Sequence, residues 1–76
     1  MVMKLLDVKS GKKFCIVDFE GSRGVELKLR QLGLLPGDTA KVIRHAPLGG
    51  PLLVECKGRR IALGRGIAVK ILVEEV

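Results

Sequence analysis

The stretch Leu32-Gly33-Leu34-Leu35-Pro36-Gly37-Asp38 contains signals that end a helix, make a turn and begin a strand. Glycine adopts the left-handed backbone of a helix C′ position without steric cost, which suits Gly33. Proline cannot continue a helix and Pro-Gly favours a turn, so Pro36 and Gly37 predict a change of direction. Apolar residues follow a helical period before Gly33 and a strand-like period after Asp38. The stretch therefore predicts a corner between one short helix and a small barrel.

The segments around this corner predict one helix and five strands. The helix runs from Arg23 to Leu32 behind Ser22 as its N-cap, and Val25 and Leu29 share its apolar stripe with Leu32. Runs rich in β-branched residues predict strands at Lys13–Phe19, Thr39–Ala46, Leu52–Lys57, Arg60–Leu63 and Val69–Glu74. Short strands in sequence with one helix after the first predict a mainly β barrel or roll.

Connections between these segments are predicted to be short. Residues 3–11 are expected to be a tether that joins the core through three apolar side chains, Leu5, Leu6 and Val8. Phe19 falls out of the strand period if it is buried, which predicts a bulge near Asp18. Gly58 and Arg59 fit a tight hairpin turn. Residues 64–68 are long enough for one turn of 3₁₀ helix.

Length and composition place the chain among small globular domains. Its 76 residues are expected to form one domain, residues 1–76. With 47% hydrophobic residues it can build one core, but it is too small for a deep enclosed substrate pocket. Cys15 and Cys56 stand alone in apolar segments, where cysteines are more often small hydrophobes than a disulfide or a metal site. No apolar run has the length of a signal peptide or of the ~20 residues of a membrane span. We therefore expect a soluble, reduced, intracellular protein.

Residue types that support catalysis or metal binding are few. The single histidine, His45, points away from Ala40 and Val42 on strand phase, so an exposed structural role is expected. The eight acidic residues are scattered and no pair has the local spacing of a carboxylate dyad. Cys15, His45 and Cys56 could form a metal site only by converging from distant segments, because no short ligand spacing is present. The sequence thus indicates no enzyme and no catalytic, cofactor-binding or metal-ligating residue.

Basic residues give the chain a net charge of +6, which favours an acidic partner. On or beside the hairpin strands and on the helix these residues are Arg44, Lys57, Arg59, Arg60, Arg65, Arg23, Lys28 and Arg30. A patch that tracks phosphates is possible, so a basic barrel that binds nucleic acid is the alternative function. Barrels of that kind normally add aromatic platforms for stacking, whereas this chain has no Trp or Tyr and two Phe in predicted core positions. Solvated strand faces also explain these residues.

Three leucines in turns form the second surface feature. Leu34 and Leu35 follow the helix, and Leu48 lies in a loop between Pro47 and Pro51. Consecutive leucines in a turn cannot easily all face inward, and an apolar spot rimmed by arginine is typical of a protein interface. The other reading is that these leucines close the two ends of the barrel, and it applies most to Leu34.

Four motifs in register resemble one known family. They are Leu29-Arg30-Gln31-Leu32-Gly33-Leu34-Leu35-Pro36-Gly37-Asp38, Arg44-His45-Ala46-Pro47-Leu48-Gly49-Gly50-Pro51, Gly58-Arg59-Arg60-Ile61-Ala62-Leu63 and Ala68-Val69-Lys70-Ile71-Leu72-Val73. Their order and spacing are similar to those of FeoA-type proteins over nearly the whole chain. The resemblance implies an SH3-like barrel of about five strands with one short α-helix inserted after the first long strand. A related domain forms part of iron-dependent DtxR-type repressors.

The resemblance also implies a function. FeoA-type proteins are non-catalytic, cytoplasmic accessories of ferrous iron uptake, and their presumed partner is FeoB, a membrane permease with a cytoplasmic GTPase domain. The family supplies no catalytic, cofactor or metal residues to carry over. We expect docking by protein–protein contact, in which the partner can recruit the chain to the inner face of the membrane without direct membrane insertion. The residues expected to contribute are Leu35, Arg44, Leu48, Arg59 and Arg60. Open strand edges also allow weak self-association.

Overall fold

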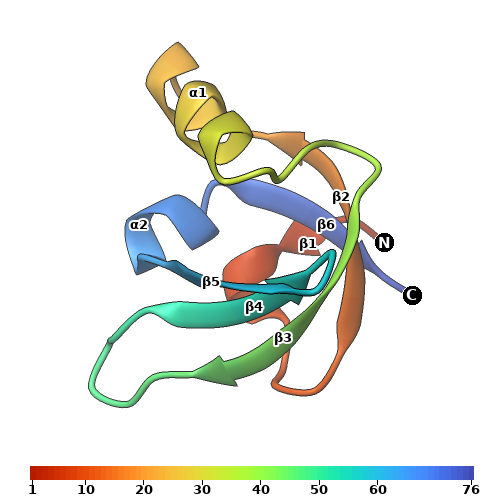
Figure 1. Cartoon of the computed structure of the whole chain (residues 1–76), viewed down its shortest axis with the longest axis vertical. Coiled ribbons are helices and arrows are strands. Elements are labelled where there is room, and N and C mark those ends of the chain that lie inside the picture. Colours follow the sequence, from red (N-terminus) through yellow and green to blue (C-terminus); the bar gives the residue numbers. More distant parts are fainter.

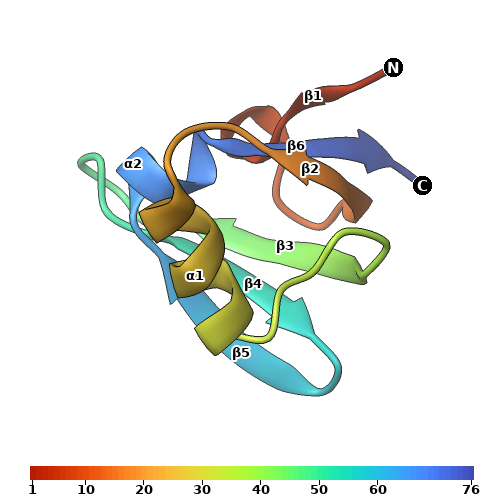
Figure 2. The same cartoon turned by 90° about the horizontal axis from the view of Figure 1, so that it is seen from above.

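Six strands form one antiparallel sheet in the order β1-β6-β2-β3-β4-β5 in the computed structural model, which describes residues 1–76. The elements are β1 Met3–Lys4, the 3₁₀ turn η1 Leu5–Asp7, β2 Lys13–Phe19, α1 Arg23–Gln31, β3 Thr39–His45, β4 Leu52–Cys56, β5 Arg59–Leu63, α2 Arg65–Ala68 and β6 Ile71–Glu75. The sheet curls strongly and α1 lies across one end of it (Figures 1 and 2). This confirms a mainly β, barrel-like fold with one helix of more than a single turn.

The largest differences from the sequence-based boundaries lie at three places, while the other element ends agree within one residue. A sixth strand, β1, pairs with β6, because the backbone of the predicted tether lines up with Leu72 and Val73. The hairpin turn consists of Lys57 and Gly58, both with positive φ, so Arg59 belongs to β5. Such a two-residue turn fits the twist of the strands. α2 is one turn of α-helix and not of 3₁₀ helix, with β6 beginning two residues later than predicted.

One hydrophobic cluster of 16 buried residues fills the inside of the curled sheet. Phe14 and Ile16 on β2 are buried as their strand phase predicts, and Leu5 and Val8 of the N-terminal segment join them. The predicted bulge is present, because the pairing of β2 with β6 shifts between Ile16 and Asp18. No charged or polar side chain is buried in this core. The buried interior is therefore built of hydrophobic residues alone.

The predicted corner is observed, with one turn at the end of α1 and a second closed by the amide of Asp38, which donates to the carbonyl of Leu35 at 3.0 Å. At the end of α1, the amide of Gly33 donates to the carbonyl of Arg30 and the amide of Leu34 donates to that of Leu29, at 3.0 and 2.9 Å. This is a Schellman motif, and Gly33 has the left-handed φ of +81° that it requires. Leu34 is buried, so it closes the core and is not an interface residue. The N-cap prediction is correct in position only, since Ser22 makes no side-chain capping bond.

His45 has a structural role, but the expectation that it is exposed is wrong. Its ring is half-buried, and Nε2 lies 2.7 Å from the carbonyl oxygen of Val8. Because a carbonyl oxygen only accepts, a ring that carries a proton on Nε2 donates this bond. The contact fastens the N-terminal segment to β3, and the strand phase could not reveal it because Val8 is 37 residues away.

Candidate partner-binding surface

The loop between β3 and β4 presents one fully exposed leucine. Leu48 is 104% exposed, and it occupies a left-handed backbone with φ +60°. Gly49 follows with φ +75°, and the amide of Gly50 donates to the carbonyl of Pro47, which closes a tight turn around Leu48 and Gly49. A non-glycine residue in this conformation costs about 1–2 kcal/mol. Leu48 accordingly contributes strain and no burial to the isolated chain, which is unusual for a leucine.

Arginines lie next to this turn. Arg44 is exposed on β3, two residues before the loop begins, and its register partner is Leu53 of β4. Arg65 at the start of α2 comes within 3.9 Å of the place where a Cβ of Gly49 would be. We call Leu48, Arg44 and Arg65 the loop surface. Arg65 was not predicted as a site residue, because only the fold brings α2 to a loop that precedes it by two strands.

The outer face of β3, β4 and β5 carries a second predicted residue, Arg60. Lys41, Glu55 and Arg60 are register partners across the three strands, and Nε of Arg60 lies 3.8 Å from a carboxylate oxygen of Glu55. Arg44 and Arg60 therefore share one face of the sheet. Arg60 lies close to the Lys57–Gly58 turn, whereas Arg44 lies near the opposite ends of the strands.

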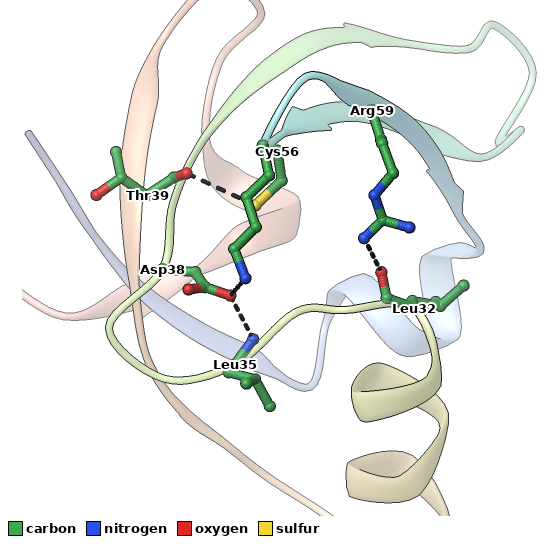
Figure 3. Close-up of polar contacts among 7 residues, drawn as sticks. Leu32, Leu35, Asp38, Thr39, Cys56 and Arg59 are labelled. Atoms are coloured by element: carbon green, nitrogen blue, oxygen red, sulfur yellow. Dashed lines mark hydrogen bonds and ion pairs between the residues drawn. The ribbon is translucent and has the colours of Figure 1, made fainter.

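Leu35 and Arg59 lie at the corner and not at the loop surface. Nη2 of Arg59 donates to the carbonyl oxygen of Leu32 at the end of α1, at 3.0 Å (Figure 3). A cation at this position complements the helix dipole and the unsatisfied C-terminal carbonyls. Leu35 is 41% exposed and borders a hollow of about 340 Å³ between α1, the end of β2 and the corner. The five predicted residues consequently do not form one patch.

The hollow beside Leu35 has no clear chemical preference. Arg23 and Arg30 line it together with Asp18 and Glu26, and Arg30 is paired with Glu26 at 3.4 Å. The opposite charges balance one another, so the lining does not select an anion or a cation. No group of three His, Cys, Asp or Glu side chains is placed to hold a metal ion anywhere in the chain.

Asp38 is the polar centre of the corner. Its carboxylate accepts the amide of Leu35 at 2.9 Å and lies 3.2 Å from Nζ of Lys57, so it joins the corner to the β4–β5 turn (Figure 3). The backbone hydrogen bond from Leu35 lowers the pKa of Asp38, and the neighbouring Lys57 lowers it further. Burial raises the pKa of the Cys56 thiol, which suits a packing role and not a nucleophile.

Asp38→Asn is expected to lower the free energy of unfolding at pH 7 by about 1 kcal/mol, because a neutral acceptor replaces a charged one. Because the folded-state pKa is lowered, the carboxylate stabilises the fold above the ordinary pKa of 3.8. That contribution disappears as the pH falls through the folded-state pKa, so the variant should approach the wild type in acid. Urea unfolding at pH 7 and pH 2.5 would measure this, with Glu26→Gln as the control for an exposed carboxylate.

Aromatic side chains do not form a stacking surface. Phe14 is buried, and Phe19 is partly buried and packs against the core. Because the basic residues described above are spread over the loop, the outer face and the corner, no continuous groove with aromatic platforms is available for bases. Neither helix has the length and apolar composition needed to cross a bilayer.

Comparison with known proteins decides which family this architecture belongs to. The model of the family described as "FeoA domain" matches residues 3–75 of this chain. The chain belongs to the FeoA family. A curated Methanocaldococcus jannaschii protein named "Putative Fe(2+) transport protein A" is 36% identical over 67 residues, which are 88% of this chain and 79% of that protein. The FeoA family is one of accessory proteins of Fe(2+) transport.

Solved structures extend the comparison to the fold. A crystal structure of an iron uptake regulatory protein, FeoA, is 32% identical, with a TM-score of 0.89 over 100% of this chain and 99% of that one. A manganese-dependent transcriptional repressor has a TM-score of 0.91 at 14% identity, and the match covers 99% of this chain and 42% of the repressor. At that identity the likeness shows a shared fold only. The SH3-like FeoA fold predicted from the motifs is thereby confirmed.

Proposed function

We propose that this FeoA chain is a non-catalytic adaptor that docks on the cytoplasmic side of an FeoB-type ferrous iron permease and adjusts its activity. Support comes from the Fe(2+) transport family and from the absence of any polar cluster in the core. In this proposal the chain resides in the cytoplasm and reaches the inner face of the membrane through its partner. In this proposal the chain acts by binding its partner through a rigid surface and not by catalysing a reaction.

The observation that carries the proposal is the full exposure of Leu48 together with its left-handed backbone. A leucine that is fully exposed on a left-handed backbone lowers the stability of the free chain, and glycine or asparagine would suit the position better. Strained residues of this kind are typical of binding sites, where a partner supplies the compensating contacts. Arg44 is exposed four residues before Leu48 and Arg65 approaches Gly49, and an apolar anchor with arginines nearby is the usual composition of an interface centre.

Leu48→Asp is expected to reduce binding to the permease's cytoplasmic domains at least about tenfold, because a buried apolar anchor would become a desolvated charge. A pull-down with immobilised cytoplasmic domains, quantified over a concentration series, measures the effect. Leu27→Asp is the matched control, since Leu27 is also an exposed leucine, 54% accessible, but lies on α1 away from the loop surface. Its retention should equal that of the wild type.

Leu48→Gly separates binding from folding in the same assay. Glycine removes the side chain and relieves the backbone strain, so the variant should be as stable as the wild type or more stable while it loses binding. Equal retention of the wild type, Leu48→Asp and Leu48→Gly would overturn the assignment of Leu48. Loss of binding in Leu27→Asp alone would move the interface to α1.

A further inference from the structure

Strand β5 is an open edge of the sheet. It stands last in the strand order and pairs with β4 alone. The opposite edge is β1, which has two residues and is too short to template another strand. β5 has five residues, and Arg60 and Ala62 on it are exposed. Natural sheets usually cover or shorten such an edge, because its free amides and carbonyls can pair with another chain.

The hairpin geometry identifies which backbone groups are free. In a two-residue hairpin the residues that flank the turn exchange both hydrogen bonds, and here these residues are Cys56 and Arg59. Bonded and outward-facing residues alternate from there, so Ile61 and Leu63 bond to β4 while Arg60 and Ala62 direct their amides and carbonyls outward. None of these outward groups takes part in a turn or loop hydrogen bond. Each outward residue offers one donor and one acceptor to an added strand.

Charges on the outer face indicate what the added strand should carry. Lys41, Glu55 and Arg60 form a row across β3, β4 and β5 in which the sign of the charge alternates. An acidic residue opposite Arg60 would continue that alternation, and opposite charges in cross-strand positions stabilise a sheet. The next outer row, Arg44, Leu53 and Ala62, ends on a small apolar residue and accepts an uncharged neighbour.

We propose that β5 is a docking edge for an extended, otherwise uncharged peptide segment of a partner protein that carries an acidic residue opposite Arg60. Binding adds a seventh strand to the sheet, main-chain hydrogen bonds supply the affinity and the Arg60 contact fixes the register. A second copy of this chain fits less well, because each copy has a charge of +6 and edge-to-edge pairing would place both Arg60 side chains on one face. The proposal does not depend on the identity of the transport partner.

The test uses a synthetic, acetylated heptapeptide of alternating valine and threonine in which glutamate replaces the central threonine. Titration into the ¹⁵N-labelled full chain should shift the amide signals of Arg59–Leu63 most strongly. N-methylation of the glutamate removes the amide donor that faces the carbonyl of Arg60 and places a methyl group against the edge, which should weaken binding at least about tenfold. A lysine in place of the glutamate should weaken it about fivefold.

A charge exchange gives the sharpest control. Arg60→Glu should prefer the lysine peptide over the glutamate peptide, whereas Arg44→Glu, on the same face but in the other row, should keep the wild-type preference. The proposal is overturned if no shifts occur up to about 2 mM peptide, or if the N-methylated peptide binds equally well. Shifts centred on the Leu48 loop or on α1, or concentration-dependent dimers in sedimentation without peptide, would overturn it too.

Discussion

Leu29→Ala is expected to lower the free energy of unfolding by about 3 kcal/mol, the middle of the range for buried leucines. Leu29 is the only buried residue of α1, with 0% of its surface exposed, while the other side chains of the helix are exposed or half-buried. Its side chain therefore anchors the helix across the open end of the sheet. Its carbonyl also accepts the amide of Leu34, but alanine keeps that bond, so the loss reports packing alone.

The matched control is Leu27→Ala on the same helix. Both substitutions change helix propensity equally, yet Leu27 is 54% exposed, and its replacement should change the free energy of unfolding by less than about 0.5 kcal/mol. Urea titrations followed by circular dichroism would give both values with their m-values. If the two variants were equally stable, α1 would not be held by the core in solution, and the corner would have to be stabilised in another way.

Local signals predicted the fold well where neighbouring residues determine the backbone. The Schellman motif at Gly33 and the bulge near Asp18 each depend on a few adjacent residues, and both are present. The short strand β1 was missed, because Met3 and Lys4 become a strand only by pairing with β6 at the other end of the chain. The hairpin turn was placed one residue late, because Lys57 takes a left-handed backbone that its residue type does not favour.

The candidate surface was harder to predict because it, too, depends on contacts between segments that are far apart in the sequence. For Leu48, between Pro47 and Pro51, the sequence left open whether the side chain is exposed or closes the barrel end. Its positive φ was not predicted, because turn conformation depends on both strands that the loop joins. Arg59 and Arg60 are adjacent in sequence and were grouped together. In a strand adjacent side chains point to opposite faces, so Arg59 reaches α1 while Arg60 faces solvent with Glu55.

Gly33→Ala is expected to lower the free energy of unfolding by about 2 kcal/mol, for two reasons that can be measured separately. The left-handed backbone, φ +81°, disfavours any side chain by about 1 kcal/mol. A Cβ at Gly33 would also collide with Nη2 of Arg59 and displace its hydrogen bond to Leu32, which is worth about 1 kcal/mol more. Chemical denaturation at neutral pH would measure the sum.

Gly58→Ala isolates the backbone contribution. Gly58 has a nearly equal φ of +76°, but a Cβ there meets nothing within 4 Å, so this variant should lose only about 1 kcal/mol. In an Arg59→Ala background, Gly33→Ala should lose the same amount as Gly58→Ala, because the side chain that it displaces is gone. Such coupling would make Arg59 a structural tie between β5 and α1 and leave Leu48 and Arg44 to face the partner. Equal losses for the two glycine variants in the wild-type background would show instead that Arg59 is free of the corner and available for docking.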